Sequence, residues 1–362
     1  MLLSSLGRRF RAPAFWDAPN LVSDAILPLA VAFSAATRLR EAIVAPPVVV
    51  TAPVICVGSV LVGGSGKTPV ALAIGERLLS KDPTRRVHFL SRGYGGAAAG
   101  PLLVSPKEHC AHLVGDEPLL LAEVAPTWVA ARRCDAAAAA CRHGADLLIM
   151  DDGLQHTTLY RDLSLLCIDS GYLLGNRRVL PAGPLREPAS RGYAKADAVI
   201  AIAPVSSGVN GMPSASELRK RLGLPDALPL LRARLEPEPT AASRLRGQRI
   251  IAFSGTAHPA RFFDTLRTLG CEFVRTPCAL PDHAPIDDGT FSTLREAAQT
   301  AGATLATTSK DAARLSASQR RAVEVLPISL KWIDGAETDL DRLIGQLSSV
   351  RARGTGAQKS VT

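Results

Sequence analysis

A glycine-rich run that ends in lysine and threonine is the clearest chemical signal in the sequence. It reads Gly63-Gly64-Ser65-Gly66-Lys67-Thr68 and lies between an apolar stretch at 54–57 and a helix-like stretch at 70–79. Glycines let backbone N–H groups point at phosphate oxygens, and a helix N-terminus adds partial positive charge. The lysine can reach the β- and γ-phosphates, and the threonine hydroxyl can bind Mg²⁺. The run therefore predicts a phosphate-binding loop (P-loop) for a nucleoside triphosphate.

The loop departs from the common pattern G-x-x-x-x-G-K-S/T at its first position, where Leu61 replaces glycine. Val62 stands where one class of dimeric P-loop ATPases has lysine, which argues against that class. The residues that we expect to contact the nucleotide are Leu61, Val62, Gly63, Gly64, Ser65, Gly66, Lys67 and Thr68.

Two adjacent carboxylates, Asp151 and Asp152, end an apolar stretch at 147–150 that is typical of a buried strand. A carboxylate in this place has the form of a Walker B element, which holds Mg²⁺ directly or through water. The alternative is a helix cap or loop carboxylate, but the upstream P-loop favours the metal role. We therefore predict that Thr68, Asp151 and Asp152 bind Mg²⁺.

Other polar residues are less informative on their own. Asp116 and Glu117 follow Gly115 in a turn, where acidic residues commonly begin a helix. His283 lies in a loop, and a single loop histidine is more often a surface residue than a catalytic one. The stretch 175–187 is rich in arginine, proline and glycine, and arginine suits phosphate recognition.

Strand-like and helix-like stretches alternate from 54 to 203, with strands expected at 54–57, 87–90, 146–150, 163–168 and 198–203. This alternation predicts βαβ units and a parallel sheet. Ligands of such sheets bind beyond the C-terminal strand ends, where the P-loop, Arg92, Asp151 and Asp169 would lie. We interpret the proline-rich stretch 204–239 as a helix at 214–222 and a linker, and a second strand–helix series begins at 249.

The composition favours a packed globular protein with anionic partners. The chain has 362 residues, 47% hydrophobic content and a formal net charge of +9. Positive charge suits phosphorylated substrates, anionic lipid or nucleic acid, although a solvated basic surface is the better explanation of net charge alone. Only 4% of residues are aromatic, so stacking platforms for nucleic acid are scarce. The seven cysteines include no C-x-x-C pair, which is typical of reduced, buried thiols and indicates no zinc site.

The N-terminal region contains an apolar stretch at 25–36 with arginines on both sides. It is shorter than the roughly 20 residues that span a bilayer. Val22, Ile26, Leu29 and Phe33 recur at helical spacing and predict one apolar helix face. Such a helix either lies in a membrane interface or packs on the core of the protein, and its own residues leave both alternatives open.

Taken together, the sequence resembles the tetraacyldisaccharide 4'-kinase family. The matching pieces, in the order of the family, are VGSVLVGGSGKTP (57–69), LSRGYGG (90–96), GDEP (115–118), DDGLQH (151–156), RD (161–162), LPAGPLRE (180–187), PARFF (259–263), LPDH (280–283) and TSKDA (308–312). DDGLQH and LPAGPLRE are far more specific than a P-loop alone. Ser309 departs from the Thr-Glu-Lys-Asp pattern of the family, so no role is assigned to it.

The resemblance implies a reaction in which ATP, with Mg²⁺ as cofactor, phosphorylates the 4'-hydroxyl of a tetraacyldisaccharide 1-phosphate to give lipid IVA. It implies that Asp116 and His283 form a catalytic dyad with Asp116 as the base, assisted by Lys67. Substrate contacts would come from Arg92, Glu117, Gln155 and Arg186. It also implies a monomer on the cytosolic face of the inner membrane, held by its N-terminal helix, with no nucleic-acid partner.

The implied fold class is α/β: a P-loop NTPase-type parallel-sheet core, a second, smaller α/β domain and an N-terminal membrane-associated helix. The expected divisions are 1–45 for the helix region, 46–225 for the kinase core, 226–350 for the C-terminal domain and 351–362 for a disordered tail. The main rival is a P-loop GTPase or ATPase metallochaperone with a soluble client. Its guanine-specific form would need an Asn-Lys-x-Asp loop, which the sequence lacks.

Overall fold

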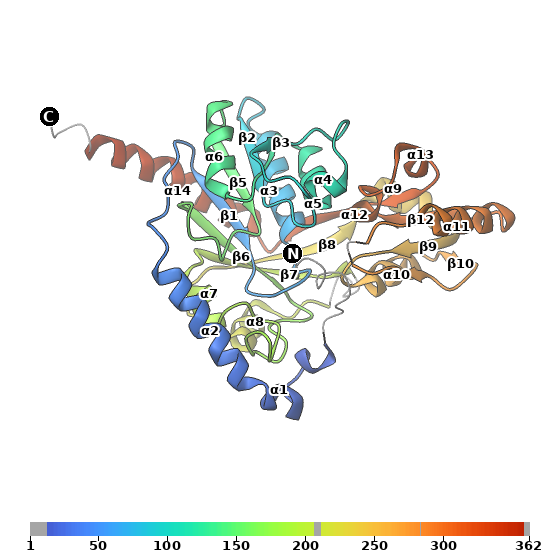
Figure 1. The fold of residues 1–362 in the computed structure, drawn as a ribbon, viewed down its shortest axis with the longest axis horizontal. Helices are drawn as coiled ribbons and strands as arrows, with labels where there is room; N and C mark the ends of the chain where they lie inside the picture. Colours follow the sequence, from blue (N-terminus) through green and yellow to red (C-terminus); the bar gives the residue numbers. More distant parts are fainter. Residues whose placement is uncertain (1–12, 206–210, 283, 358–362) are drawn as a thin grey trace.

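A nine-stranded sheet forms the larger part of the molecule (Figure 1). The computed structural model describes residues 13–205, 211–282 and 284–357. The strand order is β14-β8-β7-β6-β1-β5-β2-β4-β3, and all neighbours are parallel except the two edge pairs, β14 with β8 and β3 with β4. The strands are β1 (Val54–Gly58), β2 (Val87–Ser91), β3 (Leu102–Leu103), β4 (Thr127–Val129), β5 (Leu147–Asp151), β6 (Leu163–Asp169), β7 (Ala198–Ala203), β8 (Leu230–Pro237) and β14 (Ile328–Ile333).

Helices cover both faces of this sheet, which explains why its central strands are continuous apolar runs. On one face, α3 (Lys67–Lys81), α5 (Asp116–Ala122) and α14 (Ala336–Ala357) pack against residues such as Ile55 and Val57. On the other face, α6 (Arg133–Arg142) packs against Val54 and Cys56, and α7 (Ala189–Ala194) and α8 (Ala215–Leu222) pack near Leu166. The parallel α/β core predicted from the sequence is confirmed.

A second, smaller sheet follows the first. Its strands are all parallel: β9 (Arg249–Ser254), β10 (Glu272–Phe273), β11 (Cys278–Ala279), β12 (Thr304–Thr308) and β13 (Glu324–Leu326). Its helices are α9 (Pro239–Leu245), α10 (Pro259–Thr268), α11 (Asp288–Thr300), α12 (Ser309–Ala312) and α13 (Ala317–Arg320). Figure 1 shows this unit extending to one side of the larger sheet.

The chain crosses between the two sheets in a way that the sequence did not indicate. The stretch 204–239 contains β8, which pairs with β7, and is not only a helix and a linker. Near the end of the second strand–helix series, two adjacent strands belong to different sheets, because β13 joins the small sheet and β14 returns to the large one. The division at 225/226 therefore does not coincide with the boundary between sheets. Arginines alternate with buried residues along β8, which is the period of a half-buried strand and is the signal that the interpretation as a linker overlooked.

Two terminal segments also differ from expectation. α14 continues to Ala357, whereas a disordered tail was expected from 351; residues 358–362 lie outside the described chain. At the N-terminal side, α1 (Leu21–Ala25) and α2 (Leu27–Ala42) replace the single apolar stretch at 25–36. Of the four residues on the predicted apolar face, Val22, Leu29 and Phe33 are 56%, 59% and 39% exposed and only Ile26 is half-buried, so most of this face does not pack on the core.

Candidate functional site

The P-loop connects β1 to α3 and has the backbone shape that its glycines predict. Gly63 and Gly66 have φ angles of 105° and 77°, which residues with a Cβ rarely adopt. A Cβ on Gly66 would also lie 2.8 Å from Ile202 Cδ1 on β7. Gly66 is the N-cap of α3, so the first backbone N–H groups of that helix face the loop. The predicted residues 61–68 thus form one continuous turn at the C-terminal edge of the sheet.

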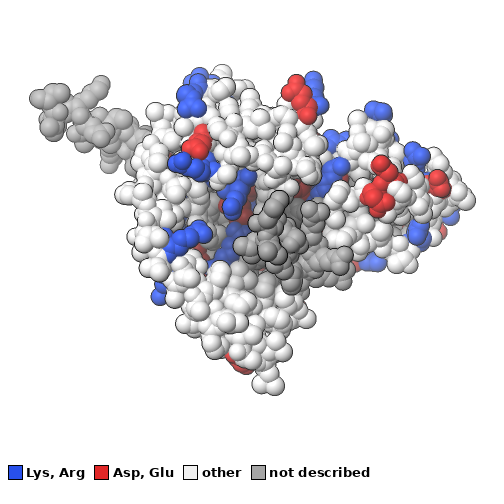
Figure 2. Space-filling view, viewed as in Figure 1, with Lys and Arg blue, Asp and Glu red and all other residues white. Residues whose placement is uncertain are grey.

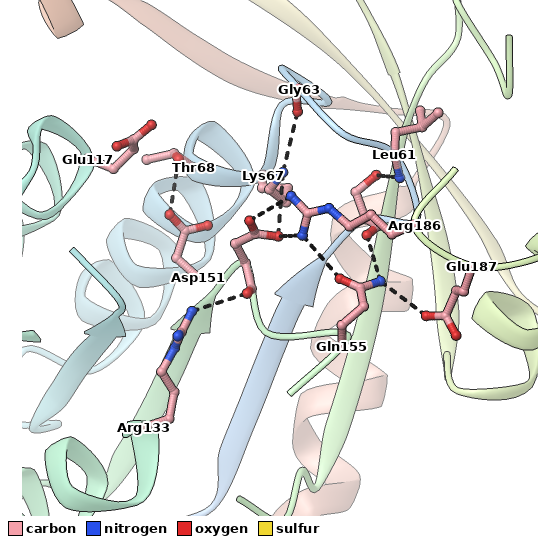
Figure 3. Close-up of polar contacts among 12 residues, drawn as sticks. Leu61, Gly63, Lys67, Thr68, Glu117, Arg133, Asp151, Gln155, Arg186 and Glu187 are labelled. Atoms are coloured by element: carbon pink, nitrogen blue, oxygen red, sulfur yellow. Dashed lines mark hydrogen bonds and ion pairs between the residues drawn. The ribbon is translucent and has the colours of Figure 1, made fainter. Parts of the chain in front are cut away.

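Two P-loop side chains contact the Walker B carboxylates (Figure 3). Thr68 Oγ1 donates to Asp151 Oδ2 at 3.0 Å, because parallel pairing of β1 with β5 places Asp151 beside Val57. Lys67 Nζ lies 3.5 Å from Asp152 Oδ1 and 3.4 Å from the carbonyl oxygen of Gly63. The structure therefore brings together the four residues predicted for the triphosphate and Mg²⁺.

The two carboxylates have opposite electrostatic environments. Burial raises the pKa of Asp151 to about 6, and the negative charge of Asp152 adds to this effect. Burial also disfavours the charged form of Asp152, but Lys67 and Arg186 outweigh it and lower its pKa to about 2. Asp151 Oδ1 is buried and has no hydrogen-bond partner among the described residues. Of the two carboxylates, Asp151 is thus the one without an ion pair to a cationic side chain among the described residues.

Asp152 is held by a bidentate arginine. Arg186 donates through Nη1 to Asp152 Oδ1 at 2.9 Å and through Nη2 to Oδ2 at 3.0 Å. Gln155 Oε1 accepts a further bond from Arg186 Nη1 at 3.1 Å. Asp152 has a left-handed backbone with φ of 50°, which turns its side chain away from the path of β5. Gln155 and Arg186, predicted as substrate contacts, therefore both belong to the P-loop edge.

The sequence reasoning missed Arg133, which begins α6 beyond the end of β4. Its Nη2 donates to the carbonyl oxygen of Asp152 at 3.2 Å, its Nε has no partner among the described residues, and burial lowers its pKa. Arginine in the first turn of a helix opposes the helix dipole, which is the signal that could have identified it. Together with burial, the charges of Arg133, Arg161 and Arg92 lower the pKa of His156 to about 4, so Arg92 lies at the same edge.

Asp116 and Glu117 face the small sheet. They occupy the first turn of α5, and Gly115, not Asp116, is the N-cap. Asp116 is buried and accepts from Arg314, which also bonds Asp311 at 3.1 Å. Glu117 pairs with Lys310 at 2.5 Å. The GDEP and TSKDA pieces therefore form a charged junction between the two sheets. His283, the predicted partner of Asp116, lies outside the described residues.

The residues present fit Mg²⁺ in the way that nucleotide enzymes usually hold it. No cluster of three or more His, Cys, Asp and Glu side chains that could form a metal cage occurs among the described residues. Mg²⁺ is instead commonly bound by one or two carboxylates, a hydroxyl and the phosphates of the substrate. The unpartnered Asp151 Oδ1 and the adjacent Thr68 hydroxyl match that donor set.

Comparisons with known proteins agree with these features. A family model described as tetraacyldisaccharide-1-P 4'-kinase matches residues 22–347. The tetraacyldisaccharide 4'-kinase of Rhodospirillum centenum is 44% identical over 349 residues, covering 94% of this chain and 97% of that relative. The enzyme of the same name from Jannaschia sp. is 42% identical, covering 93% of this chain and 100% of the relative.

A solved structure has the same fold. The crystal structure of an "apo" form of LpxK from Aquifex aeolicus in complex with ATP aligns with a TM-score of 0.67 and 24% identity, covering 90% of this chain and 99% of that one. None of these proteins is a GTPase or metallochaperone, so the rival interpretation from the sequence is not supported.

Proposed function

The chain belongs to the tetraacyldisaccharide-1-P 4'-kinase family, and from this premise we propose how its own residues carry out the reaction of the family. The protein is a kinase that transfers the γ-phosphate of ATP to the 4'-hydroxyl of a tetraacyldisaccharide 1-phosphate. The observation that carries the assignment of residues is the P-loop edge, where Lys67, Thr68, Asp151 and Asp152 converge on one another.

The P-loop binds the triphosphate. Backbone N–H groups of the glycine-rich turn and the N-terminus of α3 would face the phosphate oxygens, and Lys67 would neutralise the β- and γ-phosphates. The N–H groups of Leu61 and Val62 are instead bonded to Ser59 Oγ and to the carbonyl oxygen of Pro184. In the structure Lys67 contacts Asp152, which already has Arg186 as a second cation. Lys67 can therefore turn toward ATP without leaving Asp152 unpaired, because Arg186 remains bonded to it.

Thr68 and Asp151 would hold Mg²⁺, and Asp152 would support them from the adjacent position. Bound there, the ion would neutralise charge on the β- and γ-phosphates. Asp151 has a buried oxygen without a hydrogen-bond partner among the described residues, so a divalent cation would offset the cost of burying that carboxylate. The part of the site next to Asp151 is held in place by the hydrogen bonds among Asp152, Gln155 and Arg186.

Asp116, together with His283, accepts the proton of the sugar hydroxyl. A hydroxyl must lose its proton as it attacks phosphorus, so a positioned carboxylate is useful, although positioning and charge supply most of the catalysis. Arg314 fixes the orientation of Asp116, and the charge of the neighbouring Glu117 acts on Asp151. The junction is thus close enough to the phosphate site for its Asp116 to act there as the base. Arg92, Glu117, Gln155 and Arg186 contact the substrate.

We further propose that α1 and α2 dock on the cytosolic surface of the inner membrane. Leu29 and Val31 of α2 are 59% and 67% exposed, and only Ala30 of this helix is buried. On the face that Figure 2 shows, the lower part of the molecule, where Figure 1 places α1 and α8, has few charged side chains. None of the described helices is sufficiently long and apolar to span a bilayer. An interfacial helix accounts for both findings.

The kinase assignment is tested by phosphate transfer. Purified protein in detergent is mixed with Mg²⁺, γ-labelled ATP and tetraacyldisaccharide 1-phosphate. We expect label in the lipid, and its loss in Lys67→Ala. ATP turnover without labelled lipid would reject the lipid as the acceptor.

The membrane proposal is tested with the double variant Leu29→Glu, Val31→Glu. Substitution is preferable to deletion because the N-terminal segment also contacts the loop before α7 and α7 itself. We expect much weaker co-sedimentation with anionic phospholipid vesicles, because the variant places two carboxylates on the docking surface. Leu103→Glu, at a residue of β3 that is 41% exposed, is the matched control and should sediment like the wild type. Unchanged sedimentation of the double variant would contradict the proposal.

A further inference from the structure

A series of polar contacts connects α2 to α7. The carboxylate of Glu41, in the last turn of α2, accepts from Arg191 at 2.6 Å and from Lys195 at 3.3 Å. Lys195 is the C-cap of α7 and donates at 2.6 Å to Glu187 as well. Glu187 is only 3% exposed, and a charge buried to that degree requires a partner. Lys195 therefore joins a carboxylate of the N-terminal helix to a buried carboxylate beside the P-loop.

Glu187 in turn fixes the orientation of Gln155. Gln155 Nε2 donates to Glu187 Oε1 at 3.1 Å and to the carbonyl oxygen of Ser59 at 3.0 Å. Because the amide nitrogen has two hydrogens and both are used, the amide oxygen must face Arg186. Arg186 then holds Asp152 with two bonds. Figure 3 shows Glu187, Gln155 and Arg186 in sequence, leading toward Lys67.

The loop that carries Arg186 is attached independently to the P-loop and to the N-terminal segment. On the P-loop side, Val62 N donates to the carbonyl oxygen of Pro184 at 2.9 Å, and Arg186 N donates to that of Val60 at 2.7 Å. On the N-terminal side, Arg178 donates to Ser23 Oγ at 2.7 Å and pairs with Asp24. A shift of α1 and α2 would therefore be transmitted to the loop at two places.

We propose that Glu41 is a positioning residue for the kinase reaction: through Lys195, Glu187 and Gln155 it holds Arg186 against Asp152, so that the placement of α2 sets the geometry of the phosphate site. The inference rests on the proposed kinase function. It gives the N-terminal helix a role in turnover in addition to membrane docking. A merely structural contact between α2 and α7 would instead affect stability or vesicle binding and leave kcat unchanged.

The test is the variant Glu41→Gln, which keeps the size of the side chain and removes its charge. We expect kcat for the lipid substrate to fall by about 3- to 30-fold, the usual range for coupling between connected sites. Co-sedimentation with anionic vesicles and the KM for ATP should change by less than about 2-fold, since neither contact surface is altered. Lys195→Gln should reproduce the fall in kcat. The matched control is Glu296→Gln, an exposed glutamate on α11, which should behave as the wild type.

A double-mutant cycle separates positioning from independent damage. In a Glu187→Gln background, Glu41→Gln should lower kcat by less than about 2-fold, because the path to Gln155 is already broken. The inference is overturned if the effects multiply, or if Glu41→Gln and Lys195→Gln keep the kcat of the wild type. A wild-type protein that labels no lipid would reject the proposed function instead, so the two failures are distinguishable.

Discussion

The P-loop edge and the junction between the sheets are both charged, but only the junction satisfies its own charges. At the P-loop edge, Asp151 Oδ1, Ser65 Oγ and Arg133 Nε are buried without a hydrogen-bond partner among the described residues. At the junction, Arg314 links Asp116, Asp311 and the carbonyl oxygen of Gly255, and Lys310 pairs with Glu117. The first region is built for a ligand that brings charge, whereas the charged side chains described in the second region pair with one another.

This difference predicts that substitutions at the P-loop edge mainly affect activity, whereas substitutions of the paired residues at the junction mainly affect stability. A buried polar atom without a hydrogen-bond partner lowers the stability of the folded state. Removing it should therefore leave the free energy of unfolding unchanged or raise it. Breaking a satisfied buried pair leaves one charge without a partner and is strongly destabilising. Activity and unfolding measurements on the same variants therefore distinguish the two regions.

The largest effect is expected for Lys67→Ala. Kinase activity should fall by about 1,000-fold or more, because the cation that faces the β- and γ-phosphates is lost. The free energy of unfolding should change by less than about 1 kcal/mol, since Arg186 still pairs Asp152. The measurements are lipid labelling and urea unfolding. Lys81→Ala, at the other end of α3, is the control and should keep full activity. A large loss of stability in Lys67→Ala would contradict the expectation that the P-loop edge contributes to activity and not to stability.

Arg314→Ala should be the most destabilising variant at the junction. It leaves the buried Asp116 and Asp311 without their shared cation, and removing one partner of a buried pair costs about 3–5 kcal/mol. Urea unfolding measures the effect. Arg321→Ala, on an exposed residue after α13, is the control and should cost less than about 0.5 kcal/mol. Equal stability of the two variants would show that the junction does not depend on this guanidinium.

Asp151→Asn should abolish activity and yet stabilise the protein without nucleotide or Mg²⁺. The folded pKa of about 6 exceeds the ordinary 3.8, so the folded state binds more protons between these values and loses stability as pH rises through them. Removing the charge should gain about 1–2 kcal/mol at pH 7.5, after loss of the bond from Thr68, and nothing near pH 4. Thermal unfolding in EDTA at both pH values measures this. A gain that did not depend on pH would contradict the electrostatic explanation.

The smallest effect is expected for Lys310→Met. Burial lowers the pKa of Lys310, but the charges of Glu117 and Asp116 outweigh it and raise the pKa overall. The side chain is still 34% exposed, so solvent screens the pair and its loss should cost about 1 kcal/mol. Urea unfolding at low and high salt checks the size and the screening. If Lys310→Met lowered the free energy of unfolding as much as Arg314→Ala does, Lys310 and not Arg314 alone would account for the stability of the junction.

Much of the site was predictable because its signals lie within short stretches of sequence. The glycines, Lys67 and Thr68 act through local backbone geometry, and Asp151 with Asp152 ends a recognisable buried strand. Parallel pairing then makes the meeting of these stretches almost inevitable. Arg133 was missed because its importance comes from its contact with Asp152 in the fold, whereas its one sequence signal, a cation in the first turn of a helix, does not by itself point to a site.

The P-loop, the Walker B carboxylates, the parallel α/β core and the family can be inferred without a structure, since each depends on local chemistry or on ordered motifs. Three-dimensional folding was needed to show that β14 returns to the first sheet and that Glu41 reaches Glu187 through Lys195. It also decided that Arg314 pairs with Asp116 from 198 residues away. The physical reason is that a buried charge must find an opposite charge in space, and the fold, not the spacing of residues, determines which one lies within reach.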